Sequence, residues 1–156
     1  MTVKVGMIVA GAIADDHCDA INRYDGAVVA AIADISTERR NALRKAYSIA
    51  KTYAKWQDLV ADRALDAVAI ALPNALHAPV SLAALKAGKH VLLDKPFALS
   101  YADAKQVADA AKRSRKVLML GMNQRYRRDA QALKAIVACG DLGDIYHAKA
   151  YWCRRT

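Results

Sequence analysis

The residues that most directly suggest chemistry are Asp94, Lys95 and Pro96, which follow the apolar run His90–Leu93. A lysine at the end of a buried strand can polarise a hydroxyl or carbonyl group, or exchange a proton with it. We therefore expect Lys95 to be a catalytic group, with the Asp94 carboxylate holding its ammonium in place. A surface ion pair at an ordinary turn is the alternative.

A second candidate is the turn after the apolar run Val3–Val9, which reads VAGAIA over residues 9–14. In the dinucleotide fingerprint G-x-G-x-x-G/A, a pyrophosphate approaches the backbone at the start of a helix. Gly11 stands at the position where the phosphate comes closest to the backbone, and Ala14 is small enough for contact between helix and strand. Val9, however, stands where the tight turn prefers glycine. An ordinary strand-to-helix turn remains the alternative here.

Asp34 directly follows the apolar run Ala27–Ala33. An acidic residue at this place can accept hydrogen bonds from the adenosine ribose and repel a 2′-phosphate, which favours NAD over NADP. Arg39 and Arg40 weaken that preference, because either could reach a phosphate. An aspartate that merely caps the next helix is the alternative.

Two more turns carry polar side chains. Pro73, Asn74 and His77 offer a rigid turn, an amide and an imidazole, although a lone histidine at a helix start is more often a structural hydrogen-bonding group. Asn123 and Arg125 follow a later apolar run, and Arg125 could bind an anionic substrate group or pair with a carboxylate.

The elements that must position these residues alternate regularly. Ser36 and Ser100 are expected N-caps, and Gly88 is expected to end a helix. Connections of helical length predict crossovers between parallel strands, and hence a doubly wound, Rossmann-like α/β domain whose ligands bind beyond the carboxyl ends of the strands. We expect strands over 3–9, 27–33, 66–72, 90–93, 117–120 and 145–152, and helices over 11–23, 36–47, 78–87, 101–113 and 129–138.

Composition narrows the class of protein further. Hydrophobic residues make up 55% and charged residues 25%, a globular balance. The net charge of +9 could indicate nucleic-acid binding. However, the basic run 112–116 lies at a helix end, where cations suit the helix dipole, and no aromatic residues are interleaved for base stacking. We expect no nucleic-acid partner.

No apolar run approaches the roughly 20 residues of a membrane span, and the first residues lack the pattern of a signal peptide. We therefore expect a cytoplasmic chain without a membrane partner. Cys18, Cys139 and Cys153 are too widely spaced for a zinc site. We expect three reduced, buried thiols and no bound metal.

Taken in order, these motifs resemble the family of glucose–fructose oxidoreductase, inositol dehydrogenase and rhizopine catabolism proteins (Gfo/Idh/MocA). The matching segments are residues 11–17, 72–77, 87–96 and 123–126. The third is the most specific, because the family carries Glu-Lys-Pro at that strand end. Asp94 stands in place of the glutamate, which keeps the charge but shortens the side chain.

The resemblance implies an N-terminal Rossmann domain followed by a larger α+β domain. It also implies hydride transfer between NAD, or possibly NADP, and a hydroxyl carbon of a sugar, inositol or related polyol. The family pattern assigns Gly11, Ala12 and Ile13 to the pyrophosphate, Asp34 to the ribose, and Pro73, Asn74 and His77 to the nicotinamide half. It assigns Lys95 to catalysis on the substrate hydroxyl, and Asp94 and Pro96 of the same turn to the cofactor. Asn123 and Arg125 are assigned to the nicotinamide and substrate side.

The resemblance also implies that residues 1–143 are the dinucleotide-binding domain and that 144–156 begin a second, substrate domain that is otherwise missing. We therefore expect the chain alone to be inactive or nearly so. The unpaired edge of a strand over 145–152 is expected to favour a homo-oligomer. The alternative function is a non-catalytic Rossmann-like module that senses nucleotides or acts as a scaffold, with Val9 marking lost affinity.

Overall fold

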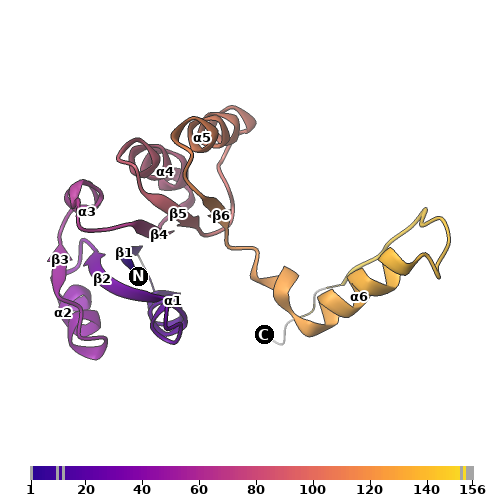
Figure 1. Cartoon of the computed structure of the whole chain (residues 1–156), viewed down its shortest axis with the longest axis horizontal. Coiled ribbons are helices and arrows are strands. Elements are labelled where there is room, and N and C mark those ends of the chain that lie inside the picture. The colour runs from indigo at the N-terminus through magenta and orange to yellow at the C-terminus, as the bar shows by residue number, and fades with distance from the viewer. Residues whose placement is uncertain (1, 10, 12, 152, 154–156) are drawn as a thin grey trace. The chain divides into compact units, whose positions relative to one another are not determined.

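The computed structural model describes residues 2–9, 11, 13–151 and 153. Its centre is a sheet of six parallel strands in the order β3-β2-β1-β4-β5-β6 (Figure 1). This order reverses between β1 and β4, as in a doubly wound fold, so the predicted fold class is confirmed. The strands are β1 Val3–Val9, β2 Ala27–Ala33, β3 Lys51–Tyr53, β4 Ala67–Ala71, β5 His90–Leu93 and β6 Leu118–Leu120.

Helices cover both faces of the sheet. α1 (Ile13–Asn22) and α2 (Thr37–Ala46) lie on one face, while α3 (Trp56–Ala61), α4 (His77–Lys86) and α5 (Tyr101–Ser114) lie on the other (Figure 1). Each face has its own apolar core, and the sheet lies between the two. Because both faces are covered, the central strands consist almost entirely of apolar residues.

The expected helix ends are confirmed by their hydrogen bonds. Ser36 Oγ accepts from the backbone N–H of Arg39 at 3.2 Å, and Ser100 Oγ accepts from that of Asp103 at 3.1 Å. Gly88 follows α4 with φ of +76°, a conformation that glycine adopts without a steric penalty. Gly11, where the pattern predicts the start of the first helix, is not helical, and the described part of this helix is Ile13–Asn22.

The sequence analysis missed β3 and α3. β3 has three residues, too few for a period to be visible, and it is ordered by pairing with β2. α3 packs on β1, where Leu59 lies so close to Gly6 that a Cβ there would be 2.6 Å from Leu59 Cδ2. Glycine at position 6 is therefore what allows α3 to approach the sheet.

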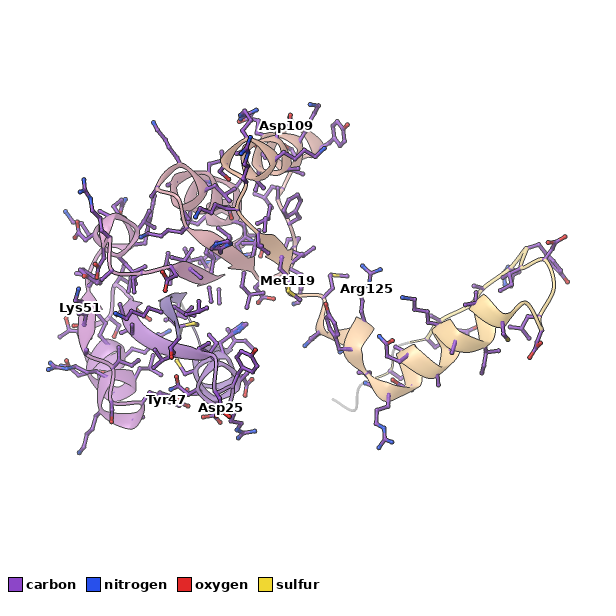
Figure 2. All side chains as sticks on the ribbon, in the orientation of Figure 1. Asp25, Tyr47, Lys51, Asp109, Met119 and Arg125 are labelled. Carbon is purple, nitrogen blue, oxygen red and sulfur yellow. The ribbon has the colours of Figure 1, made fainter. Side chains whose placement is uncertain are left out.

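One cluster fixes the chain around α3. Asp62, which follows this helix, accepts hydrogen bonds from Lys51 Nζ at 2.8 Å and from the Tyr53 hydroxyl at 2.9 Å. The lysine, the Ala64 backbone N–H and the tyrosine together lower the pKa of Asp62 to about 2. Figure 2 labels Lys51, on β3 at one edge of the sheet.

Residues Met1–Gly121 form one compact unit, and Met122–Thr156 form a second. The second unit contains a 3₁₀ turn, Asn123–Tyr126, and α6, Arg128–Cys139, which ends at Gly140 with φ of +82°. The assignment of 1–143 and 144–156 to two domains stays a prediction.

The expected strand over 145–152 does not form. Residues 145–151 have no regular structure, and residue 152 lies outside the described residues. A single strand gains stability only by pairing, and within the described part of this unit there is no partner strand.

The expectation of three buried thiols is wrong for two of them. Cys18 is buried between α1 and the sheet, and this burial raises its pKa to about 11, whereas Cys139 and Cys153 are exposed. Among the helices of the described residues, none has the length and apolar character needed to cross a bilayer.

Candidate functional site

The loops that carry most of the predicted site residues meet at one edge of the sheet. All six strands run in the same direction, so their carboxyl ends share that edge. Across the sheet, Asp34 follows β2, Gly11 follows β1, Pro73 follows β4 and Asp94 follows β5. β2 and β5 are three strand spacings apart, or about 14 Å. A ligand that touched both Asp34 and the turn after β5 would have to be extended.

Asp34 is 4% exposed, which is unusual for a carboxylate. Its Oδ1 accepts the backbone N–H of Ser36 at 2.8 Å. Its Oδ2 is also buried, but accepts no hydrogen bond from any residue that the structure describes. A buried carboxylate oxygen without a donor carries a desolvation penalty that a ligand hydroxyl could relieve.

Two arginines from α2 surround this carboxylate in different ways. Arg39 Nε lies 3.5 Å from the free Oδ2, an ion pair without a hydrogen bond. Arg40 is engaged instead with backbone and hydroxyl groups: it donates to the Asp34 carbonyl at 2.5 Å and to Thr37 Oγ1 at 2.9 Å.

Gly11 follows β1 with φ of +144°, a value that side chains other than glycine rarely adopt. A Cβ built at this position would meet no atom within 4 Å, so the space beside the backbone is open. Val9 is 2% exposed and packs in the core on the α1 and α2 side. Ile13, the first residue of α1, is 41% exposed, and Ala12 lies outside the described residues.

A hollow of about 350 Å³ opens beside Asp34, on the side of the β3–α3 connection. Its lining is mainly apolar and includes Ile35, Trp56, Leu72 and Leu76. A flat, mainly apolar group such as a purine suits a pocket of this size and character. Sequence reasoning missed these residues, although Ile35 and Leu76 are apolar residues within polar turns, a signal that could have identified them.

A second hollow, of about 420 Å³, lies between the start of α1 and α2 and is bordered by Gly11, Asp15 and Arg39. Tyr47, labelled in Figure 2, donates a hydrogen bond to Asp15 Oδ1 at 3.1 Å. Burial and this hydrogen bond raise the pKa of the Tyr47 hydroxyl above its usual value. Together, the two hollows flank the carboxylate of Asp34 and its ion pair with Arg39.

The turn after β4 combines exposed and buried groups. Pro73 and Asn74 are exposed at the start of a 3₁₀ turn, Asn74–Leu76. His77 is only 1% exposed, and its Nδ1 and Nε2 lie 2.5 Å from the Pro96 carbonyl and 2.8 Å from the Leu72 carbonyl. The ring is thus occupied by two backbone carbonyls, one from each of the neighbouring turns.

The turn after β5 presents Lys95 to solvent, with Pro96 also exposed. Asp94 Oδ1 accepts the backbone N–H of Lys95 at 2.8 Å. Our expectation that this carboxylate holds the lysine ammonium is wrong, because the described residues show no ion pair between the two side chains. The short aspartate fixes the backbone of the turn and leaves the ammonium free.

Asn123 and Arg125 lie in the second unit, on the 3₁₀ turn Asn123–Tyr126, and both are exposed. Their roles toward the nicotinamide and the substrate stay predictions. A larger hollow of about 570 Å³, between α5 and β6, contains none of the predicted site residues. The volume of this hollow alone is no evidence that it binds the coenzyme or the substrate.

The fit of this site to a dinucleotide can be judged from two features. The buried Oδ2 of Asp34 lacks a donor, which a ribose hydroxyl would supply. The open space beside Gly11 leaves room for a phosphate close to the backbone. Asp34 follows β2 and Gly11 follows β1, and these two strands are adjacent, so one ligand can reach both residues.

Comparisons with known proteins agree with the fold described above. The sequence profile of the Gfo/Idh/MocA oxidoreductase family, with its NAD-binding Rossmann fold, matches residues 3–122. Inositol 2-dehydrogenase from Salmonella paratyphi B is 35% identical over 156 residues, which cover 97% of this chain and 46% of that protein. The chain thus spans less than half the length of this relative.

Solved structures share the fold. The crystal structure of an NAD binding oxidoreductase from Klebsiella pneumoniae matches with a TM-score of 0.84 at 31% identity, over 92% of this chain and 40% of that one. A biliverdin reductase from Synechocystis sp. PCC 6803, crystallised with biliverdin and NADP+, matches with a TM-score of 0.79 at 27% identity, over 87% of this chain and 43% of that one. The chain therefore belongs to the Gfo/Idh/MocA oxidoreductase family and contains its NAD-binding Rossmann domain.

Proposed function

We propose that this chain is the coenzyme-binding part of an NAD-dependent dehydrogenase that acts on a hydroxyl carbon of inositol, a sugar or a related polyol. The observation that carries the proposal is the buried Asp34 Oδ2, which lacks a hydrogen-bond donor beside an apolar hollow of purine size. The relatives named inositol dehydrogenases support the class of substrate.

Different residues of this chain bind different parts of the coenzyme. Asp34 accepts a hydrogen bond from the adenosine ribose, the hollow lined by Ile35 and Trp56 takes the adenine, and Gly11 lets the pyrophosphate approach the backbone. Pro73 and Asn74 border the nicotinamide half. When bound, NAD supplies the ring that accepts the hydride.

Lys95 is the proposed catalytic group. It binds the substrate hydroxyl and exchanges a proton with it, while Asp94 and His77 hold the backbone of its turn. Because the Lys95 ammonium forms no ion pair within the described residues, it is free to engage a substrate oxygen. The roles of Arg125 and Asn123 toward the substrate and the nicotinamide rest on the resemblance to the family alone.

Titration of the chain with NADH, followed by fluorescence, tests the coenzyme assignment. We expect saturable binding by folded protein, and a chain that stays folded without binding NADH would refute the proposal. A fusion of this chain to the C-terminal part of the Salmonella relative tests the reaction. The fusion should oxidise inositol with NAD, and Lys95→Met should abolish turnover while changing the Kd for NADH by no more than about twofold.

A non-catalytic sensing or scaffold module is the second candidate, and it rests on Val9. Val9 is buried in the core and lines the apolar hollow beside Asp34, but it does not line the second hollow beside Gly11, which favours tolerance of this valine. The variant Val9→Gly distinguishes the two functions. Much tighter NADH binding by this variant would favour the non-catalytic module, and an unchanged Kd would favour the dehydrogenase.

A further inference from the structure

Arg39 has the only side chain in ionic contact with Asp34 among the described residues. Its Nε lies 3.5 Å from the buried Oδ2, at a distance and angle that form no hydrogen bond. Within the same residues, the guanidinium makes no other hydrogen bond or ion pair. The Arg39 side chain is 44% exposed, whereas that of Asp34 is 2% exposed, so the arginine is accessible to a ligand from solvent and the carboxylate is enclosed.

The position of Arg39 connects the two hollows of the site. Asp34 borders the apolar hollow proposed for the adenine, and Arg39 borders the second hollow, together with Gly11. A phosphate on the ribose 2′-oxygen would extend from the ribose, at Asp34, toward this guanidinium. The opposing charge in the second hollow is Asp15, and its carboxylate is already bound by the Tyr47 hydroxyl.

Two other cations could compete for the same phosphate. Arg40 is committed to the Asp34 carbonyl and to Thr37 Oγ1. Lys55 borders the apolar hollow from the β3–α3 connection, but it does not border the second hollow. Of the three, Arg39 alone has a cationic group without a hydrogen bond within the described residues and also lies beside both Asp34 and the open space at Gly11.

We propose that Arg39 determines the coenzyme selectivity of this site, because it neutralises Asp34 and binds the 2′-phosphate of NADP, so that the chain accepts both NAD and NADP. This inference rests on the proposed function. An aspartate alone at this position would exclude a 2′-phosphate by charge. Paired with an arginine that can form two parallel hydrogen bonds to phosphate, it loses most of that exclusion.

The test is a comparison of NADH and NADPH binding, by fluorescence and calorimetry, in the chain and in three variants. Arg39→Gln removes the proposed contact, and Arg40→Gln and Lys55→Gln are matched controls that remove the same charge nearby. We expect the chain to bind the two coenzymes with Kd values within about tenfold of each other. Arg39→Gln should weaken NADPH binding by about tenfold or more and change NADH binding by less than about threefold. The two control variants should leave the ratio of the Kd values for NADPH and NADH unchanged.

The possible outcomes separate the two proposals. If NADH binds but NADPH does not, or if Arg39→Gln leaves the ratio unchanged, the selectivity role is overturned and the coenzyme assignment stands. The selectivity role is also overturned if Lys55→Gln or Arg40→Gln, rather than Arg39→Gln, changes the ratio of the Kd values for NADPH and NADH. If neither coenzyme binds to folded protein, both proposals fail together. Circular dichroism of each variant verifies the fold.

Discussion

His77 joins Pro96 to the end of β4: its Nδ1 lies 2.5 Å from the Pro96 carbonyl, and its Nε2 lies 2.8 Å from the Leu72 carbonyl. The ring is almost fully buried at the start of α4. It therefore connects the turn proposed for the nicotinamide half with the turn that carries Lys95. The geometry gives His77 a positioning role between the two turns, and its assignment to the nicotinamide half stays a prediction.

The first prediction concerns this connection. His77→Phe keeps an aromatic ring at this position but removes both ring nitrogens, and so leaves both carbonyls without a side-chain partner; it should lower the free energy of unfolding by about 2–3 kcal/mol. Urea denaturation measures the change, with the exposed His147→Phe as the control, expected to lie within about 0.5 kcal/mol of the parent. Equal stability of the His77 variant and the parent would show that the ring does not hold the two turns.

The second prediction concerns the free oxygen of Asp34. Asp34→Asn keeps the shape of the side chain but removes its charge, and should weaken NADH binding by about tenfold, because hydrogen bonds to charged acceptors contribute about 1.5–3 kcal/mol. NADH fluorescence measures the Kd. The control is Asp58→Asn on α3, which should leave the Kd unchanged. An Asp34 variant with the parent's Kd would remove the ribose assignment.

The third prediction separates backbone strain from ligand contact at Gly11. Gly11→Ala and Gly88→Ala each place a side chain at positive φ, +144° and +76°, and should each cost about 1–2 kcal/mol of stability. Only the Gly11 variant should also weaken NADH binding, because its methyl group enters the open space proposed for the pyrophosphate. Thermal unfolding and NADH titration give the two readouts. If both variants bind NADH equally well, Gly11 is not at the phosphate.

The fourth prediction is a pH dependence of stability at Asp62. Folding lowers the pKa of this carboxyl from 3.8 to about 2, so its contribution is complete above pH 3.8 and is lost as the pH falls through about 2. Asp62→Asn should therefore cost about 2 kcal/mol at pH 6 and close to nothing at pH 2. Urea denaturation at both pH values measures this. Asp25→Asn is the control, and a cost that is the same at both pH values would contradict the linkage.

The fifth prediction concerns the approach of α3 to the sheet. Gly6→Ala would place a methyl group 2.6 Å from Leu59 Cδ2 and 2.8 Å from Leu65 Cδ1, so it should destabilise the protein by about 1–3 kcal/mol. The double variant Gly6→Ala with Leu59→Ala should recover part of the loss relative to the sum of the single variants. Urea denaturation measures the free energies of unfolding. Strictly additive changes in the two single variants and the double variant would show that residues 6 and 59 are not in steric conflict.

Much of this fold follows from local sequence. β1, β2 and β5 have the predicted bounds, because strands inside a covered sheet are rich in apolar residues and end at polar or turn-forming residues. Ser36 and Ser100 cap helices for an equally local reason, since a serine hydroxyl satisfies backbone N–H groups within three residues. The residues that follow each strand, and hence the candidate site, come from the same pattern.

Other features depend on partners far away in the chain. β3 forms only because β2 offers an edge, and the strand expected over 145–152 is absent in 145–151 because the described residues of its unit offer none. Only the tertiary structure left Asp34 Oδ2 without a donor, placed Arg39 beside it and turned His77 toward two carbonyls. The sequence specifies which chemical groups a segment carries and whether its pattern of apolar residues favours a helix or a strand. The three-dimensional packing decides which of those groups are satisfied by the chain itself and which stay free for a ligand, because hydrogen bonds and ion pairs act between neighbours in space.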